Sequence, residues 1–362
     1  MQGKRGTGHR RVFKAFQVIA LVMLIAIPTM TAFSSETVLK TSSKEFLAKV
    51  LVLDRTVEKH PLDLGVYTSG PLQTTAQELG QIDAWMESQG LASRVQIAGT
   101  FMDIEFPNPA YNVIRDLDAA WDQGTAPFVN LAVGTTDVGP RSAAQVANGE
   151  IDAAIRTWAA VFSQWSQGGA KRAYIAPLQE MNADWVSYGL DPENYIAAYT
   201  RIQRIFNEEG VTAEAVTWVF APNGWSMPEH AFENYYPAEA RVDMIAFSGF
   251  NFGACADNID PWQEYAEAIQ PYVHRMQDMA PGKPILVAQI GSVTEGGDQG
   301  SWLVETLGQL SRERNVVGFI YFNVAKHEAG AVHCPVVDWR VFDPQSNLAQ
   351  NGLLAAMQSI ES

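Results

Sequence analysis

The sequence predicts a parallel (β/α)8 barrel. Eight short apolar runs, rich in β-branched residues, alternate with longer segments of helical periodicity. No low-complexity linker divides the chain after its N-terminal segment. A doubly wound sheet is the second choice, because no glycine-rich phosphate-binding turn follows the first apolar run. The chain therefore predicts one barrel domain at residues 61–362, after a lead-in at residues 35–60.

The expected strands are short and apolar, as strands covered on both faces are. In chain order they are Asp63–Thr68, Arg94–Ala98, Phe128–Val133, Ala173–Pro177, Ala215–Ala221, Met244–Gly249, Ile285–Ile290 and Val317–Phe322. One helix is expected at Ile151–Gln167, where apolar residues recur on one face. Another is expected to start at Asp191 and Pro192, an N-cap residue followed by proline at the first helical position, and to reach Gly210. A third covers Gly300–Arg312.

The composition restricts the class of partner. The 362 residues carry a formal net charge of −15, with 18% charged and 47% apolar residues. Nucleic acid is excluded as a partner, because phosphate binding needs a basic surface. The negative net charge is compatible with an uncharged ligand. The chain has 10 Trp, and indole rings stack on sugars as well as filling cores. Trp158, Trp165 and Trp302 lie in helical patterns and are expected to pack inside. No cofactor is indicated, and a monomer is expected.

The N-terminus has the pattern of an export signal. A basic region at residues 4–14 precedes the apolar run Phe16–Ile27, Pro28 ends that run, and Ala32-Phe33-Ser34 offers a small-x-small cleavage site. The apolar run is shorter than the roughly 20 residues that span a bilayer. Residues 1–34 are therefore expected to be a signal peptide and the protein to be secreted or extracytoplasmic. An uncleaved membrane anchor through residues 15–33 is the alternative.

Two cysteines, Cys255 and Cys334, lie far apart in the sequence, each in an expected loop after a strand. An even number of cysteines in an exported chain favours one disulfide. A metal site is the weaker interpretation. His327 and His333 lie near Cys334 in the sequence, but their spacing matches no zinc motif.

In a (β/α)8 barrel the chemistry lies at the C-terminal ends of the strands. The sequence places a glutamate, several amides and several aromatic residues at the ends of the fourth to eighth expected strands. They are Gln179, Glu180, Asn182, Trp185, Asn223, Trp225, Phe250, Asn251, Gln289 and Tyr321. Carboxylates and amides hydrogen-bond hydroxyl groups, and aromatic faces stack on pyranose rings. This mixture predicts a sugar site.

These motifs resemble those of glycoside hydrolase family 26, the retaining β-mannanases and their β-glucanase and β-xylanase relatives. The segment IAPLQEMNADW resembles the family's acid/base motif. GEIDAAIRTWAAVFSQW, DPENYIAAYTRIQRIFNEEGV, VTWVFAPN, YYPAEARVDMIAFSGFN, KPILVAQIGS and DWRV follow the family's running order, and the matches cover most of residues 64–341. The resemblance implies a (β/α)8 barrel acting on a β-linked polysaccharide of the β-mannan or β-glucan type. It implies Glu180 as acid/base, Trp185 and Trp225 as sugar contacts, and Tyr321 as an aromatic floor.

Three positions depart from the family's pattern. Retaining hydrolysis uses two carboxyl groups about 5 Å apart, but Gln289 stands where the family has its nucleophilic glutamate. Phe250 stands where the family has a tyrosine that bonds the nucleophile, and Gln179 where it has a histidine. An amide is a poor nucleophile and does not offset positive charge at the anomeric carbon. Three changes in one cluster favour a natural change over a single engineered substitution.

Three functions stay open. In an altered hydrolase, Glu295, Glu105 or Asp103 supplies a replacement carboxylate, or Gln289 orients a substrate 2-acetamido group for substrate-assisted attack. In a catalytically inactive glycan-binding protein, the aromatic cleft alone is kept. A scaffold that uses its outer surface is the third, and no sequence feature specifically supports it. Asp338–Arg340 allows either a structural ion pair or a sugar contact.

Overall fold

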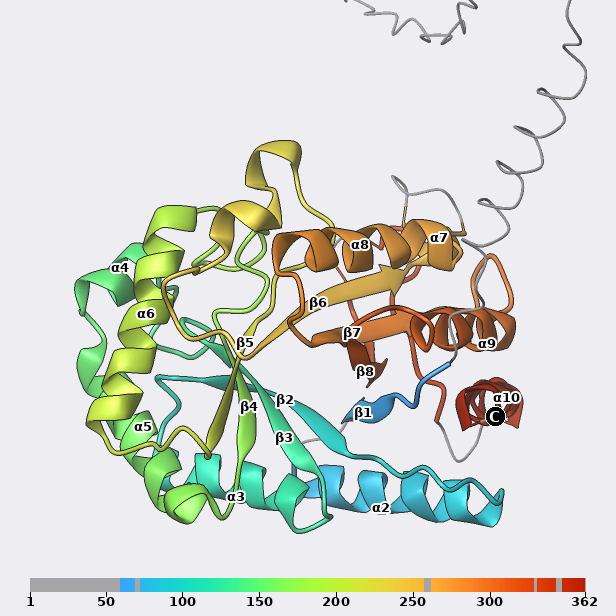
Figure 1. The fold of residues 1–362 in the computed structure, drawn as a ribbon, viewed down its shortest axis with the longest axis horizontal. Helices are drawn as coiled ribbons and strands as arrows, with labels where there is room; N and C mark the ends of the chain where they lie inside the picture. Colours follow the sequence, from blue (N-terminus) through green and yellow to red (C-terminus); the bar gives the residue numbers. More distant parts are fainter. Residues whose placement is uncertain (1–58, 69–71, 257–261, 329–330, 343–346, 362) are drawn as a thin grey trace, which may run out of the picture. The chain divides into compact units, whose positions relative to one another are not determined.

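The protein is a closed eight-stranded parallel barrel, as the sequence predicts (Figure 1). The computed structural model describes residues 59–68, 72–256, 262–328, 331–342 and 347–361. The barrel strands are β1 (Asp63–Thr68), β2 (Ile97–Asp103), β3 (Ala126–Ala132), β4 (Ala173–Pro177), β5 (Val216–Phe220), β6 (Met244–Asn251), β7 (Ile285–Ser292) and β8 (Val316–Asn323). Pairing of β1 with β8 closes the barrel. The expected signal peptide, residues 1–34, lies outside the described residues.

Helices surround the barrel (Figure 1). They are α2 (Leu72–Ser88), α3 (Pro109–Trp121), α4 (Ala143–Asn148), α5 (Asp152–Ser166), α6 (Pro192–Glu208), α7 (Tyr265–Ala268), α8 (Gln270–Met279), α9 (Gln299–Leu310) and α10 (Asn347–Glu361). The carboxylate of Asp191 caps α6 by accepting the N–H of Asn194, which confirms the expected start of that helix. In the described part of the chain, no helix is both long enough and apolar enough to cross a bilayer.

Short elements complete the fold. The described loops contain the 3-10 turns η1 (Gln167–Gly169), η2 (Pro228–His230), η3 (Phe232–Tyr235) and η4 (Gly253–Cys255). A small antiparallel sheet pairs β9 (Ala325–Lys326) with β10 (Val337–Asp338) after the last barrel strand. This sheet brings Trp339, the residue after β10, back to the C-terminal end of β8, where its N–H donates to Val324 O.

The second strand begins three residues later than the sequence predicts. Arg94–Ala98 was the expected range, but β2 runs from Ile97 to Asp103. Gly99 lies within the strand because the ring of Tyr67 crosses over it: a Cβ at Gly99 would lie 2.3 Å from Tyr67 Cε1. Glycine often ends or interrupts a strand. Gly99 instead lies within β2, where its lack of a side chain leaves space for the ring of Tyr67. The shift places Phe101 and Asp103 in the strand.

Two apolar clusters lie on the two faces of the barrel sheet. Inward-facing residues such as Leu286, Ala288 and Ile320 fill the barrel, while outward-facing residues such as Val287 and Ile290 pack with the helices. Side chains alternate along a strand, so two outward residues three positions apart require an irregularity in β7. That irregularity is important for the site.

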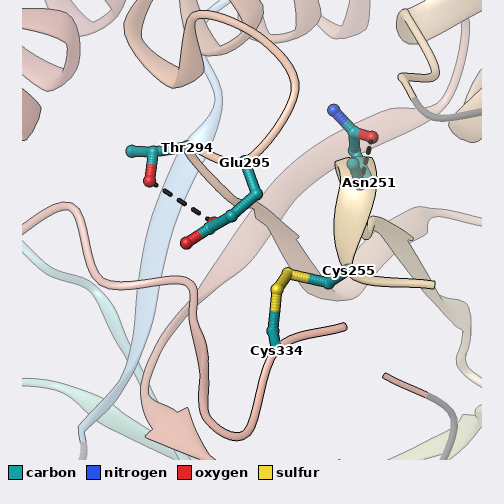
Figure 2. Close-up of a disulfide and its surroundings, with 6 residues drawn as sticks. Asn251, Cys255, Thr294, Glu295 and Cys334 are labelled. Carbon is teal, nitrogen blue, oxygen red and sulfur yellow. Dashed lines mark hydrogen bonds between the residues drawn. A yellow bond between two sulfur atoms is a disulfide. The ribbon is translucent and has the colours of Figure 1, made fainter. Parts of the chain in front are cut away.

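One disulfide joins two loops after barrel strands. Cys255 in η4, after β6, is bonded to Cys334, in the segment after β9, with the two Cα atoms 5.0 Å apart (Figure 2). The backbone N–H of His333 also donates to Cys255 O, at 3.2 Å. The bond ties together parts of the chain that are 79 residues apart. It therefore restrains two loops that follow the C-terminal ends of strands.

Candidate active site

The loop after β4 contains an unusual concentration of left-handed backbone. Leu178 (φ 53°), Glu180 (φ 56°) and Leu190 (φ 61°) are three of the six described non-glycine residues with positive φ. Such a conformation costs on the order of 1–3 kcal/mol per residue and persists only where the surroundings impose it. Here the N–H of Leu178 donates to Leu131 O and that of Glu180 to Ala221 O, both at 2.8 Å. The ends of the neighbouring strands therefore impose the backbone that presents Glu180.

The carboxylate of Glu180 accepts two hydrogen bonds. Trp185 Nε1 donates to Oε2 at 2.9 Å, and Asn223 Nδ2 donates to Oε1 at 3.1 Å. The residue is half-buried, so one carboxylate is oriented from two loops and is still partly open to solvent. This is a suitable arrangement for an acid/base group or for a carboxylate that accepts sugar hydroxyls. Asn223 is thus placed beside Glu180, as a site residue should be.

Asn182 has a different role from the sugar contact that the sequence suggested. It is 1% exposed. Its Oδ1 accepts the N–H of Asn223 at 2.9 Å, and its Nδ2 donates to the carbonyls of Asn223 (2.9 Å) and Trp225 (3.3 Å). Both ends of the amide are used by the loop after β5. Asn182 therefore positions Asn223, which in turn holds Glu180.

Two tryptophans beside Glu180 expose their rings. Trp185 is 54% and Trp225 is 55% exposed, whereas large apolar side chains are mostly buried in this fold. Trp185 is bonded to Glu180 directly. Trp225 follows Asn223 by two residues and is held through its carbonyl by Asn182. Exposed aromatic faces beside hydrogen-bonding groups are the usual means of binding pyranose rings.

A β-bulge in β7 directs Gln289 inward. The pairs Val287–Phe319 and Ile290–Tyr321 span three steps on β7 but two on β8. The extra residue lets both Ala288 and Gln289 face the barrel interior while Val287 and Ile290 face the helices. Gln289 is 6% exposed. None of the described residues forms a hydrogen bond with its amide group.

The register links Gln289 to Glu180 across the rim. Gln289 pairs with Ser248 of β6, Ser248 forms an isolated bridge with Asn223, and Asn223 bonds Glu180. The ends of four consecutive strands therefore lie side by side at one rim. Along these four strand ends, Glu180 provides a carboxylate. Gln289 provides an amide at the position where the family 26 pattern has a second carboxylate. Gln179 is also buried in this region, at 7% exposure, and its Oε1 is enclosed without a partner among the described residues.

An aromatic cluster lies beside Gln289. Trp339 has its ring centroid 5.2 Å from that of Phe250 and 5.5 Å from those of both Phe252 and Phe322. Tyr321 is not the aromatic floor that the resemblance implied. It packs in the outer cluster and donates its hydroxyl to Trp339 O at 2.8 Å. Alternation along β8 turns Phe322, rather than Tyr321, to the inside.

Asn251 also supports a loop rather than facing a sugar. It is fully buried. Its Oδ1 accepts the N–H groups of Gly253 and Gln263, and its Nδ2 donates to Ser292 Oγ at 3.0 Å. The side chain therefore fixes the segment that leads to the disulfide, and the sugar contact expected for Asn251 is wrong.

The three acidic residues considered as a replacement nucleophile are either held in other contacts or exposed. Asp103 is 1% exposed and accepts bonds from the N–H of Glu105 and from both N–H and Oγ1 of Thr135. Glu105 forms a two-pronged ion pair with Arg141, with both distances 2.8 Å. Glu295 is exposed beside the disulfide, as Figure 2 shows. The first two carboxylates are bound in structural contacts, and the third lies on a solvent-exposed loop.

Sequence reasoning missed two rim residues, Tyr67 and Phe101. Their rings stack with centroids 5.3 Å apart, and Phe101 is 46% exposed. Asn130 Nδ2 donates to Tyr67 Oη at 2.6 Å. Burial raises the pKa of Tyr67; the bond from Asn130 opposes the rise and the charge of Glu180 adds to it. Tyr67 is the last residue but one of an expected strand, so the rule that places site residues at strand ends could have found it. Phe101 was missed because the expected second strand ended before it.

Metal-binding groups do not assemble at this rim in the described part of the chain. The described cluster with ligand-like spacing is Cys255, Glu295 and Cys334, with its ligand atoms within 4.8 Å of one another. Its two sulfur atoms form the disulfide, and a disulfide offers no thiolate to a metal. Two roles were considered for Asp338–Arg340, a structural ion pair and a sugar contact. Asp338 and Arg340 form an ion pair at 2.7 Å, which agrees with the structural role.

The comparisons with known proteins agree with the sequence resemblance. No family model matches the chain. Endoglucanase H of Acetivibrio thermocellus is 25% identical over 304 residues, which cover 79% of this chain and 30% of that protein. The chain thus spans less than a third of the length of this curated relative.

Two solved structures show the same fold. A β-mannanase from a symbiotic protist of the termite Reticulitermes speratus, solved with a gluco-manno-oligosaccharide, matches with a TM-score of 0.55 and 14% identity over 88% of this chain and 91% of that one. A modular endo-β-1,4-mannanase of family 26 from Cellulomonas fimi matches with a TM-score of 0.56 and 16% identity over 82% and 70%. These likenesses show the barrel fold, and a family 26 mannanase is among the similar structures, so the resemblance predicted from the sequence is confirmed.

Asn182→Ala should lower the free energy of unfolding by about 2 kcal/mol, because it leaves buried backbone groups of the loop after β5 without partners. Chemical denaturation measures the change. Asn207→Ala, at an exposed position of α6, is the matched control and should change stability by less than about 0.5 kcal/mol. Equal effects of the two substitutions would contradict the positioning role of Asn182.

Proposed function

For this family 26-like barrel we propose binding of a β-linked polysaccharide, of the β-mannan or β-glucan type, across the C-terminal rim. The observation that carries the proposal is the pair of exposed indole rings: Trp185, which is bonded to Glu180, and Trp225, which lies two residues after Asn223. Stacking faces near a carboxylate and an amide match the apolar faces and hydroxyl edges of a pyranose chain. The similar proteins named above, an endoglucanase and two mannanases, support this ligand class.

We propose further that the unchanged protein binds this ligand without hydrolysing it by the retaining route. That route needs a carboxylate nucleophile. Gln289 supplies an amide in the matching position, and Asp103 and Glu105 are held in structural contacts. The loss of one carboxylate removes both the covalent step and the electrostatic stabilisation of an oxocarbenium-like transition state.

Hydrolysis with Glu180 as acid/base is the second candidate. One observation favours it: the strained backbone of Glu180 and both hydrogen bonds to its carboxylate are present. Such an enzyme requires a nucleophile other than residue 289. Its hydrolytic activity should therefore be present before residue 289 is changed, whereas a binding protein should gain activity only after the change. The substitutions below separate the two candidates.

Trp225→Ala should weaken binding of mannohexaose or cellohexaose roughly tenfold, because it removes one stacking face. Trp185→Ala should weaken it at least as much, because it also releases Glu180. Trp185→Phe is the matched control: it keeps an aromatic ring but loses the indole N–H that bonds Glu180 and part of the stacking face, so its effect should be smaller than that of Trp185→Ala. Isothermal titration calorimetry measures these affinities. If both Trp→Ala variants bind as the unchanged protein does, the ligand site is not at this rim.

Gln289→Glu should create a retaining hydrolase from the unchanged binding protein, raising reducing-end release from β-mannan or β-glucan by at least about 100-fold. The added substitution Phe250→Tyr should raise it further, since it supplies a hydroxyl beside the new carboxylate. Glu180→Ala in the Gln289→Glu background should abolish the gain. Hydrolysis by the unchanged protein that is lost with Glu180→Ala would instead establish the second candidate.

We also propose that the protein is exported, with the signal peptide at residues 1–34 removed. The basic and apolar pattern of this segment supports export, as does a disulfide, which persists in oxidising compartments. After expression with its own N-terminus in a bacterial host, N-terminal sequencing should find the chain starting after Ser34. An intact N-terminus in the membrane fraction would support the anchored alternative.

A further inference from the structure

The amide of Gln289 has hydrogen-bonding capacity that the described protein residues do not use. Its nitrogen offers two donors and its oxygen accepts. Neither atom is among the fully enclosed polar atoms that lack a partner, although the residue as a whole is more than nine-tenths buried. The amide therefore lies open to the rim on a side chain that is otherwise fixed by packing. A buried polar group in this state normally has a bound partner.

The groups next to Gln289 are uncharged and largely apolar. Gly291, two residues further along β7, lies against Phe250 and Trp339: a Cβ there would be 3.3 Å from Phe250 Cδ1 and 2.9 Å from Trp339 Cδ1. On the β6 side Gln289 pairs with Ser248, which is 4% exposed. Phe250 presents a bare ring edge at the position where family 26 has a tyrosine hydroxyl. The primary amide of Gln289 is thus placed near the aromatic ring of Phe250.

We infer that Gln289 recognises the 2-acetamido group of a β-linked N-acetylhexosamine polymer. This inference rests on the proposed function and names the sugar bound at one point of the same rim. An acetamido group has an N–H donor, a carbonyl acceptor and a methyl group. Gln289 Oε1 accepts the N–H, Gln289 Nε2 donates to the carbonyl, and the methyl group packs on the partly exposed ring of Phe250, which the buried Trp339 supports from behind.

The chemistry distinguishes this ligand from a plain glucan or mannan. A carboxylate only accepts hydrogen bonds, so a glutamate at residue 289 would repel the acetamido carbonyl. A single sugar hydroxyl in the same place would engage one end of the Gln289 amide, and a second, neighbouring hydroxyl would be needed for the other end. A hydroxyl would also fail to cover the apolar ring of Phe250. An amide facing an amide satisfies both ends at once.

Isothermal titration calorimetry with four hexasaccharides tests the inference. The ligands are N-acetylchitohexaose, its fully deacetylated form, cellohexaose and mannohexaose. The unchanged protein should bind N-acetylchitohexaose at least tenfold more tightly than the other three, since a site built for a polar group rejects analogues that lack it. Gln289→Leu, which keeps the side-chain size and removes the amide, should abolish this preference, so that N-acetylchitohexaose binds no more tightly than cellohexaose.

Two further variants keep the test decisive if Gln289→Leu does not fold. Gln289→Glu retains the size and is titrated only with N-acetylchitohexaose and its deacetylated form, since it is expected to hydrolyse the other two ligands; it should lose the preference for the N-acetylated ligand through the carbonyl repulsion. Phe250→Tyr should reduce that preference severalfold by placing a hydroxyl against the methyl group. Circular dichroism confirms the fold of each variant before titration.

The outcomes separate the two proposals. Equal affinity of the unchanged protein for all four hexasaccharides, or a preference that survives in Gln289→Leu and Gln289→Glu, overturns the acetamido assignment while β-glycan binding stands. Binding of none of the four overturns both. A preference for N-acetylchitohexaose that disappears with the amide, and weakens in Trp225→Ala for every ligand, is the result expected here.

Discussion

Closure of the barrel is the constraint on which the site depends. β1 pairs with β8 along its whole length, so strands from the two ends of the fold become neighbours. The fit is close: a Cβ at Gly65 would lie 2.8 Å from Ile320 Cγ1. Once the sheet is closed, all eight C-terminal strand ends meet at one rim. Glu180 on the loop after β4 and Gln289 on β7 belong to one site only because of this closure.

The polar residues at the rim divide into two kinds. Asn182, Asn251 and Asp103 are nearly fully buried, and each satisfies several backbone groups of a neighbouring loop. Glu180 and Asn223 are half-buried and bond each other. Because a buried polar group must find partners, the buried residues are committed to structure. Few polar residues are therefore left to contact a ligand, and a larger number of buried polar residues hold them in place.

This division explains what the sequence could and could not predict. The order of strands and helices follows from apolar periodicity, and β1 and β4 match their expected bounds. The face on which a strand-end residue lies is harder to predict. Tyr321 and Phe322 are adjacent and both aromatic, and only the pairing register shows that the second faces inward. Gln289 faces inward because a bulge adds one residue to β7, and no sequence pattern predicts this bulge.

The strained loop after β4 limits the functions that fit this rim. Left-handed backbone at Leu178 and Glu180 costs on the order of 1–3 kcal/mol each, and the hydrogen bonds to Leu131 and Ala221 impose it. The result is an oriented carboxylate with an indole on one oxygen and an amide on the other. A carboxylate fixed in this way can bind hydroxyl groups without any nucleophile opposite it, so the geometry at Glu180 is compatible with the neutral amide at Gln289. Under the proposed function, that amide cannot carry out the covalent step, and it offers a donor that a glutamate lacks. In that proposal the rim serves selective recognition of a glycan rather than bond cleavage.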